Sequence, residues 1–194
     1  MKKALFGCLL AMAVAFVFLN PCPSLAGPFG TNMGDAKEKF KNLTDAGDNN
    51  YWTRDVPLRH SVFAEYFLLF GENGLNGVIA QSTYKNDRFG IQAQNAYKKV
   101  KEQLIKKYGE PEIKEFLREG ALFKDNSEFV MSLYKSERVH ASVWELKKPI
   151  DNIKRITLLL SGEGVSMCKI IISYSYINRE KYEEKKAALE NDAL

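Results

Sequence analysis

Residues 153–177, IKRITLLLSGEGVSMCKIIISYSYI, decide the fold of this chain. Within them, apolar and polar side chains tend to alternate, which is the two-residue period of a β-strand with one buried face. The sequence Gly-Glu-Gly at 162–164 interrupts this pattern and provides a turn. Because so short a link joins neighbouring strands in opposite directions, the stretch predicts antiparallel strands over 153–161 and 165–177.

The residues just upstream extend the same pattern. Two more strands are expected over 128–134 and 139–146, joined by the link Lys135–Arg138. In a sheet with one covered face, every second residue points to that face. The residues expected to face the covering helices are Phe129, Met131, Leu133, Val139, Ala141, Val143, Ile156, Leu158, Leu160, Cys168, Ile170, Ile172 and Tyr174.

A hairpin and a helix precede these four strands. Apolar runs over 62–70 and 75–81 flank the turn sequence Gly-Glu-Asn-Gly, which predicts a hairpin. Between this hairpin and the later strands, apolar residues recur at helical spacing: Ala93, Tyr97, Val100, Leu104 and Tyr108. Gly109 is a typical residue for the end of this helix, and Pro111 prevents the helix from continuing.

The two ends of the chain complete the predicted order. Asp35 is a candidate cap for a short helix through Leu43, after a flexible lead that starts at Gly27. Residues 44–60 are rich in Asp, Gly and Asn and are expected to form a connector. The prediction is an α+β fold with an antiparallel sheet of about six strands, in the order α-β-β-α-β-β-β-β-α, and helices mainly on one face. Residues 27–61 are expected to form the short helix and connector, 62–177 a single domain, and 178–194 a charged C-terminal helix or tail.

Residues 1–26 have the composition of an export signal. Lys2 and Lys3 precede an apolar run from Ala4 to Leu19, and Ser24-Leu25-Ala26 supplies the small residues that a signal peptidase accepts. We expect cleavage between Ala26 and Gly27, a periplasmic or secreted location in a bacterium, and no stable membrane insertion afterwards. Cys22 follows Leu-Asn-Pro, which does not fit the small-residue box of a lipoprotein.

Charge and motifs narrow the function classes. Without residues 1–26 the chain has 26 basic and 24 acidic residues, a balance that argues against nucleic-acid binding.

His60 and His140 are far apart in sequence and Cys168 is the only cysteine beyond the signal, so no metal or cofactor is expected. No Gly-x-Ser-x-Gly motif is present, which favours a non-enzymatic protein. A pair of carboxylates acting on sugars stays open, because the acidic residues are too dispersed to select a pair.

A candidate binding surface remains on the sheet face opposite the expected core. If the predicted registers hold, Tyr134 and Trp144 form an aromatic patch beside His140 and Arg155. Tyr, Trp and Arg are enriched among the residues that dominate binding energy at protein interfaces. The alternative is an ordinary solvated sheet face, or one that the terminal helices cover.

Several motifs resemble those of small exported bacterial, periplasmic proteins of unknown function. They are Gly-Pro-Phe-Gly followed by Met-Gly within 27–34, the strand and glycine turn of 63–77, Lys-Tyr-Gly-Glu-Pro at 107–111, and the pattern of 131–138. The segment around Met33-Gly34 is also similar to small outer-membrane assembly lipoproteins, whose helix-plus-sheet folds bind other proteins. The first resemblance implies export and the strand order above. The leading hypothesis is a non-enzymatic module that binds another envelope protein through a sheet face or edge; the alternative is a cell-wall hydrolase or inhibitor.

Overall fold

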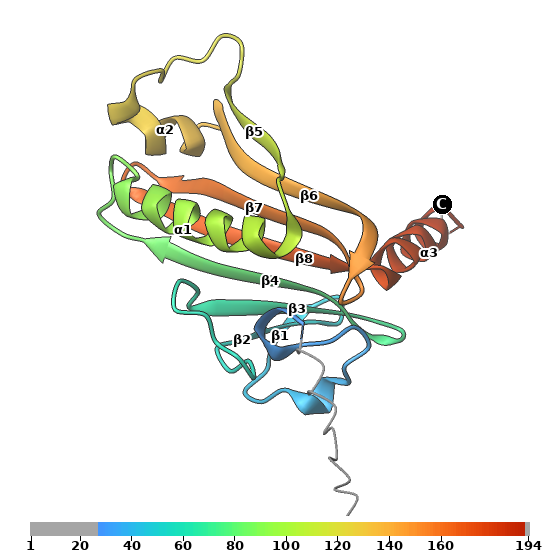
Figure 1. The fold of residues 1–194 in the computed structure, drawn as a ribbon. Helices are drawn as coiled ribbons and strands as arrows, with labels where there is room; N and C mark the ends of the chain where they lie inside the picture. Colours follow the sequence, from blue (N-terminus) through green and yellow to red (C-terminus); the bar gives the residue numbers. More distant parts are fainter. Residues whose placement is uncertain (1–26, 193–194) are drawn as a thin grey trace, which may run out of the picture.

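The computed structural model describes residues 27–192, and within them the chain forms an α+β fold built on one antiparallel sheet (Figure 1). The sheet has eight strands in the order β1-β2-β3-β4-β8-β7-β6-β5. The predicted fold class is confirmed, whereas the expected strand number of about six is an undercount. The predicted signal, residues 1–26, lies outside the described residues.

The elements have the following bounds. The strands are β1 (Thr44–Gly47), β2 (Asn50–Thr53), β3 (Glu65–Gly71), β4 (Gly74–Tyr84), β5 (Glu112–Leu117), β6 (Arg138–Ile150), β7 (Ile153–Gly164) and β8 (Met167–Tyr176). The helices are α1 (Ile91–Tyr108), α2 (Phe129–Tyr134) and α3 (Asn178–Asp192), with 3-10 turns η1 (Pro28–Gly30), η2 (Lys37–Lys39) and η3 (Asn126–Glu128).

The strongly periodic segments fold as predicted. The β7–β8 and β3–β4 hairpins form, and α1 spans the expected helix. Gly109 ends α1 with φ of 82°, and its N–H donates to the Ile105 carbonyl at 2.9 Å. At the other end, the buried Asp87 carboxylate accepts from the backbone N–H groups of Gln92 (3.2 Å) and Ala93 (3.0 Å). These contacts satisfy groups that a helix terminus leaves without an intrahelical partner.

The core lies between the sheet and the helices on one of its faces. Leu158 of β7 pairs with Ile172 of β8, and Ile172 pairs with Ala80 of β4, so their side chains share a face. The His140 ring contacts Tyr97 of α1 at 4.6 Å and Phe129 of α2 at 5.4 Å between centroids, which places both helices on that face. The inward residues predicted for β7 and β8 are all buried there.

The prediction of a strand over 128–134 is wrong, because these residues form the end of η3 and the helix α2. The Glu128 side chain accepts a hydrogen bond from the Asp125 N–H at 3.2 Å. The Asp125 side chain accepts one from the Glu128 N–H, which completes a capping box. Phe129, Val130 and Leu133 are then buried on one helical face, so the alternating Phe129-Met131-Leu133 pattern does not describe the packing.

The predicted face of β6 is also wrong. Ser142 pairs with Leu158, so Ser142, His140 and Trp144 share the helix face, whereas Val139, Ala141 and Val143 belong to the opposite face. Partners on α1 explain the inversion. The hydroxyls of Ser142 and Tyr97 lie 2.7 Å apart, and the Trp144 indole N–H donates to the Gly109 carbonyl at 2.7 Å.

Three further differences concern the N-terminal part and the sheet edge. The helix expected over 35–43 is a single 3-10 turn, η2. The expected connector 44–60 contains β1 and β2, whose hairpin turns through Asp48 and Asn49 with positive φ values. Residues 112–117 form β5, a strand that was not expected. Among the described residues, no helix combines the length and the apolar character needed to cross a bilayer.

Candidate functional site

The four predicted binding residues do not form one patch. Trp144 is only 2% exposed and lies in the core, and the His140 ring is half-buried between Tyr97 and Phe129. Tyr134 is 44% exposed but lies at the end of α2 rather than on a strand. Arg155 is on the opposite face of the sheet, where its Nε lies 2.9 Å from a Glu145 carboxylate oxygen.

The polar cluster around His140 is a packed part of the structure. Glu115 of β5 joins it, with one carboxylate oxygen 3.2 Å from Lys101 Nζ and 4.0 Å from His140 Nε2. Burial lowers the pKa of His140, which favours the neutral ring. Ser142 is fully buried and its described hydroxyl partner is Tyr97, not His140. The cluster therefore lacks the accessible nucleophile bound to a base that acyl transfer requires.

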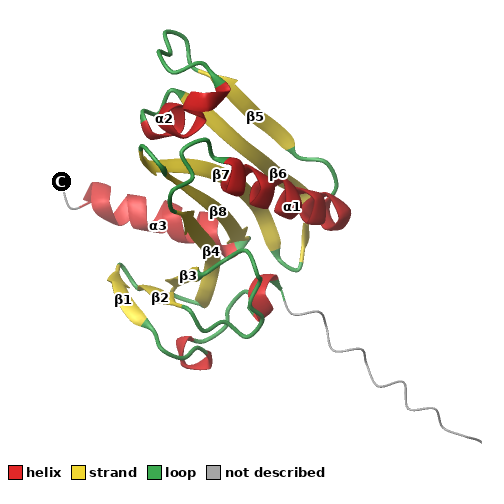
Figure 2. Cartoon of the chain, turned by 90° about the vertical axis from the view of Figure 1, so that its left-hand side faces the viewer, coloured by secondary structure: helices red, strands yellow, loops and turns green. Residues whose placement is uncertain are grey.

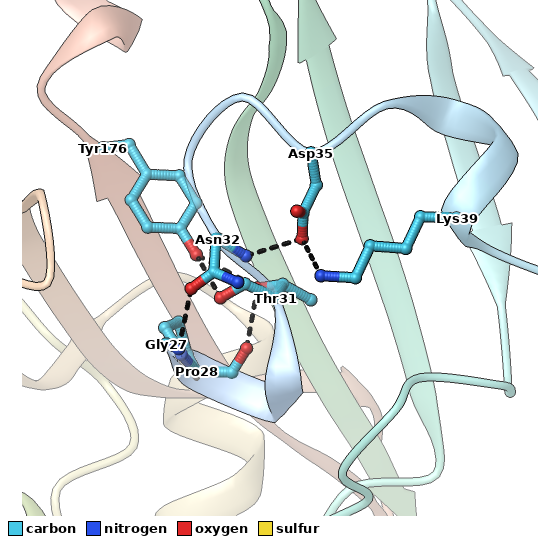
Figure 3. Close-up of polar contacts among 7 residues, drawn as sticks. All are labelled: Gly27, Pro28, Thr31, Asn32, Asp35, Lys39 and Tyr176. Atoms are coloured by element: carbon cyan, nitrogen blue, oxygen red, sulfur yellow. Dashed lines mark hydrogen bonds and ion pairs between the residues drawn. The ribbon is translucent and has the colours of Figure 1, made fainter. Parts of the chain in front are cut away.

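Residues 27–35, here called the N-terminal anchor, are held by a network of hydrogen bonds (Figure 3). The Gly27 N–H donates to Asn32 Oδ1 at 3.2 Å, and the Asn32 N–H donates to Asp35 Oδ2 at 2.7 Å. The Thr31 hydroxyl donates to the Pro28 carbonyl at 2.7 Å and lies 3.0 Å from the Tyr176 hydroxyl of β8. The expectation of a flexible lead from Gly27 is thus wrong, because Gly27 to Thr31 are buried.

Aromatic packing explains the Gly-Pro-Phe-Gly sequence of this anchor. The Phe29 ring meets Phe63, Tyr66 and Tyr174 edge-on, with centroids 4.9–5.8 Å apart. Gly30 follows with φ of 75°, and a Cβ there would lie 2.8 Å from the Pro57 Cβ. The glycine thus permits both the left-handed conformation and the close approach of the 57–58 backbone.

The β5 strand forms one free edge of the sheet (Figure 2). The Arg118 N–H donates to the Glu137 carbonyl at 2.7 Å, in continuation of the β5–β6 register. Since backbone groups alternate in direction along an antiparallel strand, the N–H and C=O groups of Ile113, Glu115 and Leu117 point away from β6. Ile113 and Phe116 are 55% and 52% exposed, so this edge offers apolar side chains as well as free backbone groups.

The opposite edge of the sheet is less suited to pairing. β1 has four residues, all exposed, and a register shift lies between Asp45 and Gly47. A short, irregular edge strand is a common way to prevent further strand addition. The β5 edge, residues 112–117, is therefore the candidate interaction site.

Comparisons of the chain with protein-family models, characterised proteins and solved structures find no match. Within residues 27–192, no three His, Cys, Asp or Glu side chains converge to hold a metal ion.

The sequence signal for β5 was weak. Its sequence, EIKEFL, places charged residues on both faces, and Pro111 and Gly109 precede it. The segment has three apolar residues, with Ile113 and Leu117 on one face and Phe116 on the other, and these alone distinguish it from a polar loop.

Proposed function

We propose that this chain is an exported, non-enzymatic module that binds an extended segment of another envelope protein by adding it as a strand to the β5 edge. The observation that carries this proposal is the coincidence of outward backbone groups with the exposed Ile113 and Phe116 on one edge strand. In such complexes the backbone hydrogen bonds supply affinity and alternate side chains supply specificity.

The two faces of β5 define what the incoming segment must carry. Ile113 lies on the helix face and Phe116 on the opposite face, since residues three apart in a strand point to opposite sides. The partner is therefore a strand with apolar side chains on both faces. Burial of both side chains contributes roughly 2–4 kcal/mol at most, because each is already partly covered.

Charges on the edge restrict which strands can join. Lys114 Nζ lies 3.4 Å from a Glu112 carboxylate oxygen, and Lys101 Nζ lies 3.2 Å from one of Glu115. Charged residues on an edge strand disfavour indiscriminate pairing. A partner with complementary charges is selected over a purely apolar strand, which supports specific recognition.

Site-specific crosslinking tests the proposal in the organism that encodes the chain. In the test variant a photoreactive residue replaces Phe116. In the control variant the same residue replaces Glu102, on the exposed face of α1. We expect a distinct adduct from position 116 that position 102 does not give. Identical adducts from the two positions would contradict a role for the β5 edge.

A proline substitution then tests the binding mode with the purified partner. Ile113→Pro removes an outward N–H, whereas Ile113→Thr retains it and trims the side chain by a similar extent. We expect Ile113→Pro to weaken binding about tenfold more than Ile113→Thr, since a backbone hydrogen bond is lost. Circular dichroism and thermal midpoints verify that both variants fold. Equal affinities for the two folded variants would exclude strand addition at this position.

A further inference from the structure

A cavity of about 440 Å³ lies between α1, the N-terminal anchor and the loop that contains Leu58 and Phe63. Its volume is in the range of small-molecule sites, roughly 300–1,000 Å³. Ile172 and Tyr174 of β8 also line it. The cavity is on the helix face of the sheet and is separate from the β5 edge.

Most of the wall is apolar. Phe29, Phe63, Val100, Leu104 and Ile172 contribute to it, and each of these side chains belongs to the buried core. An apolar ligand here would contact side chains that packing already holds in place. Such preorganised walls lower the ordering cost of binding.

Tyr174 adds a hydroxyl-bearing side chain to this wall. Tyr174 is 7% exposed, and among residues 27–192 its hydroxyl makes no hydrogen bond. The other buried tyrosines differ: Tyr66 accepts from the His60 N–H, Tyr97 pairs with Ser142, and Tyr176 pairs with Thr31. Among the described residues, the fully buried side-chain atoms without a hydrogen-bond partner are Asn76 Nδ2 and Asn178 Oδ1, so the Tyr174 hydroxyl keeps some access to solvent. It is therefore available to donate to a ligand that accepts a hydrogen bond.

The chemistry of the Tyr174 hydroxyl favours donation to an anion. Burial raises the pKa of Tyr174 far above its usual range, so the hydroxyl keeps its proton at physiological pH. A protonated phenol can donate to a carboxylate, and such charge-assisted hydrogen bonds are stronger than neutral ones.

Cations lie beside the same cavity. Arg59 is exposed, lines the cavity and makes no ion pair with any described residue. Lys107 also lines it, 5.1 Å from the centroid of the Tyr108 ring and 3.1 Å from a carboxylate oxygen of Asp151. His60 also lines the cavity, with its Nε2 3.1 Å from Gln103 Oε1. None of the described residues that line the cavity is acidic, so together with Arg59 and Lys107 they give it charge complementarity to an anion.

We propose that this cavity binds an aliphatic carboxylate of the fatty-acid class, with its chain between Phe29, Leu104 and Ile172 and its carboxylate accepting a hydrogen bond from Tyr174 near Lys107 and Arg59. The proposal goes beyond strand addition at β5 and does not depend on it. It assigns a small-molecule site to the part of the fold where the N-terminal anchor meets α1.

Calorimetric titration with three probes tests the chemistry. The probes are decanoate, decanol with the same chain but no charge, and acetate with the charge but no chain. We expect decanoate to bind and the other two to bind at least tenfold more weakly. Equal binding of decanoate and decanol, or no binding of decanoate, would overturn the proposal.

Two variants locate the site. Tyr174→Phe removes only the hydroxyl and should weaken decanoate binding roughly tenfold or more, as expected for a hydrogen bond to a charged group. Because the hydroxyl makes no hydrogen bond to a described residue, this variant should keep or raise the thermal midpoint. Leu104→Trp fills the cavity and should abolish binding, whereas Lys99→Ala, on the exposed face of α1, should leave it unchanged. Binding that survives Leu104→Trp in folded protein, or a lowered midpoint for Tyr174→Phe, would contradict the assignment.

Discussion

At the residue scale, three buried polar contacts on the helix face of the sheet join specific partners. Ser142 meets the Tyr97 hydroxyl, Trp144 donates to the Gly109 carbonyl, and Thr31 meets Tyr176. Each pair joins elements that are distant in the sequence. Because an unpaired buried group costs about 1–3 kcal/mol, these contacts select one arrangement of α1 and the anchor over alternatives.

The burial of the Cys168 thiol can be tested through the pH dependence of stability. Burial raises the pKa of its thiol to about 12, whereas an exposed thiol in the unfolded chain titrates near 8.5. The buried, protonated thiol contributes to the free energy of unfolding. Because its pKa is raised in the folded protein, this contribution is complete below about pH 8.5 and declines as the pH rises toward 12. The stability advantage of the wild-type protein over Cys168→Ala should therefore shrink between about pH 7 and pH 9.5.

Urea unfolding of both proteins at the two pH values measures this change. Tyr97 and Tyr176, whose pKa values are also raised to about 12, are common to both proteins and cancel in the comparison. A stability difference that is independent of pH would show that the thiol does not titrate differently in the two states.

At the scale of elements, the sequence predicts the helices and strands that have a long hydrophobic periodicity and that pair with segments close in the sequence. The β7–β8 and β3–β4 hairpins and α1 satisfy this condition. The six residues of α2 do not, because three alternating apolar residues fit a strand as well as a helix until the Asp125 and Glu128 caps are recognised. The face of β6 depends on partners supplied by α1, which no strand pattern contains.

The candidate sites were predictable to a smaller degree. A sheet edge was one of the expected binding surfaces, but the edge strand itself was not recognised. Tyr174 was expected to be buried, and it is, but its place in a cavity wall beside Phe29 depends on the position of the anchor. Long-range packing of this kind leaves no periodic signal in the sequence.

The turn at Gly30 provides a prediction for an element. Gly30 and Gly120 have similar positive φ values, 75° and 78°, but a Cβ would meet Pro57 at Gly30 and nothing within 4 Å at Gly120. Gly120→Ala should cost only the backbone strain, about 1–2 kcal/mol. Gly30→Ala adds a steric clash with Pro57 and should lower the free energy of unfolding by about a further 1 kcal/mol. Urea denaturation measures both; equal losses would mean that the 57–58 backbone moves away freely.

At the scale of the whole molecule, the N-terminal anchor connects the start of the described chain to its last strand. Thr31 contacts Tyr176, 145 residues away, and the Leu75 N–H donates to the Asp35 carbonyl at 3.0 Å. The anchor thus joins β4 and β8, two adjacent central strands. Gly27, which takes part in the contacts of the anchor, is the residue that we expect to follow signal cleavage.

The contacts of Gly27 lead to a prediction about the exported protein. A chain that starts at Gly27 keeps the hydrogen bond to Asn32, since an ammonium group donates as an amide N–H does. A Cβ at position 27 would lie 2.5 Å from the Thr31 carbonyl oxygen, so the first residue must be small. We expect mass spectrometry of the exported protein to give Gly27 as its N-terminal residue, and the chain expressed from Gly27 to fold with an unchanged thermal midpoint. A retained signal, an acylated Cys22, or a start site beyond Asp35 would contradict this prediction, because the exported chain would then not start with the anchor.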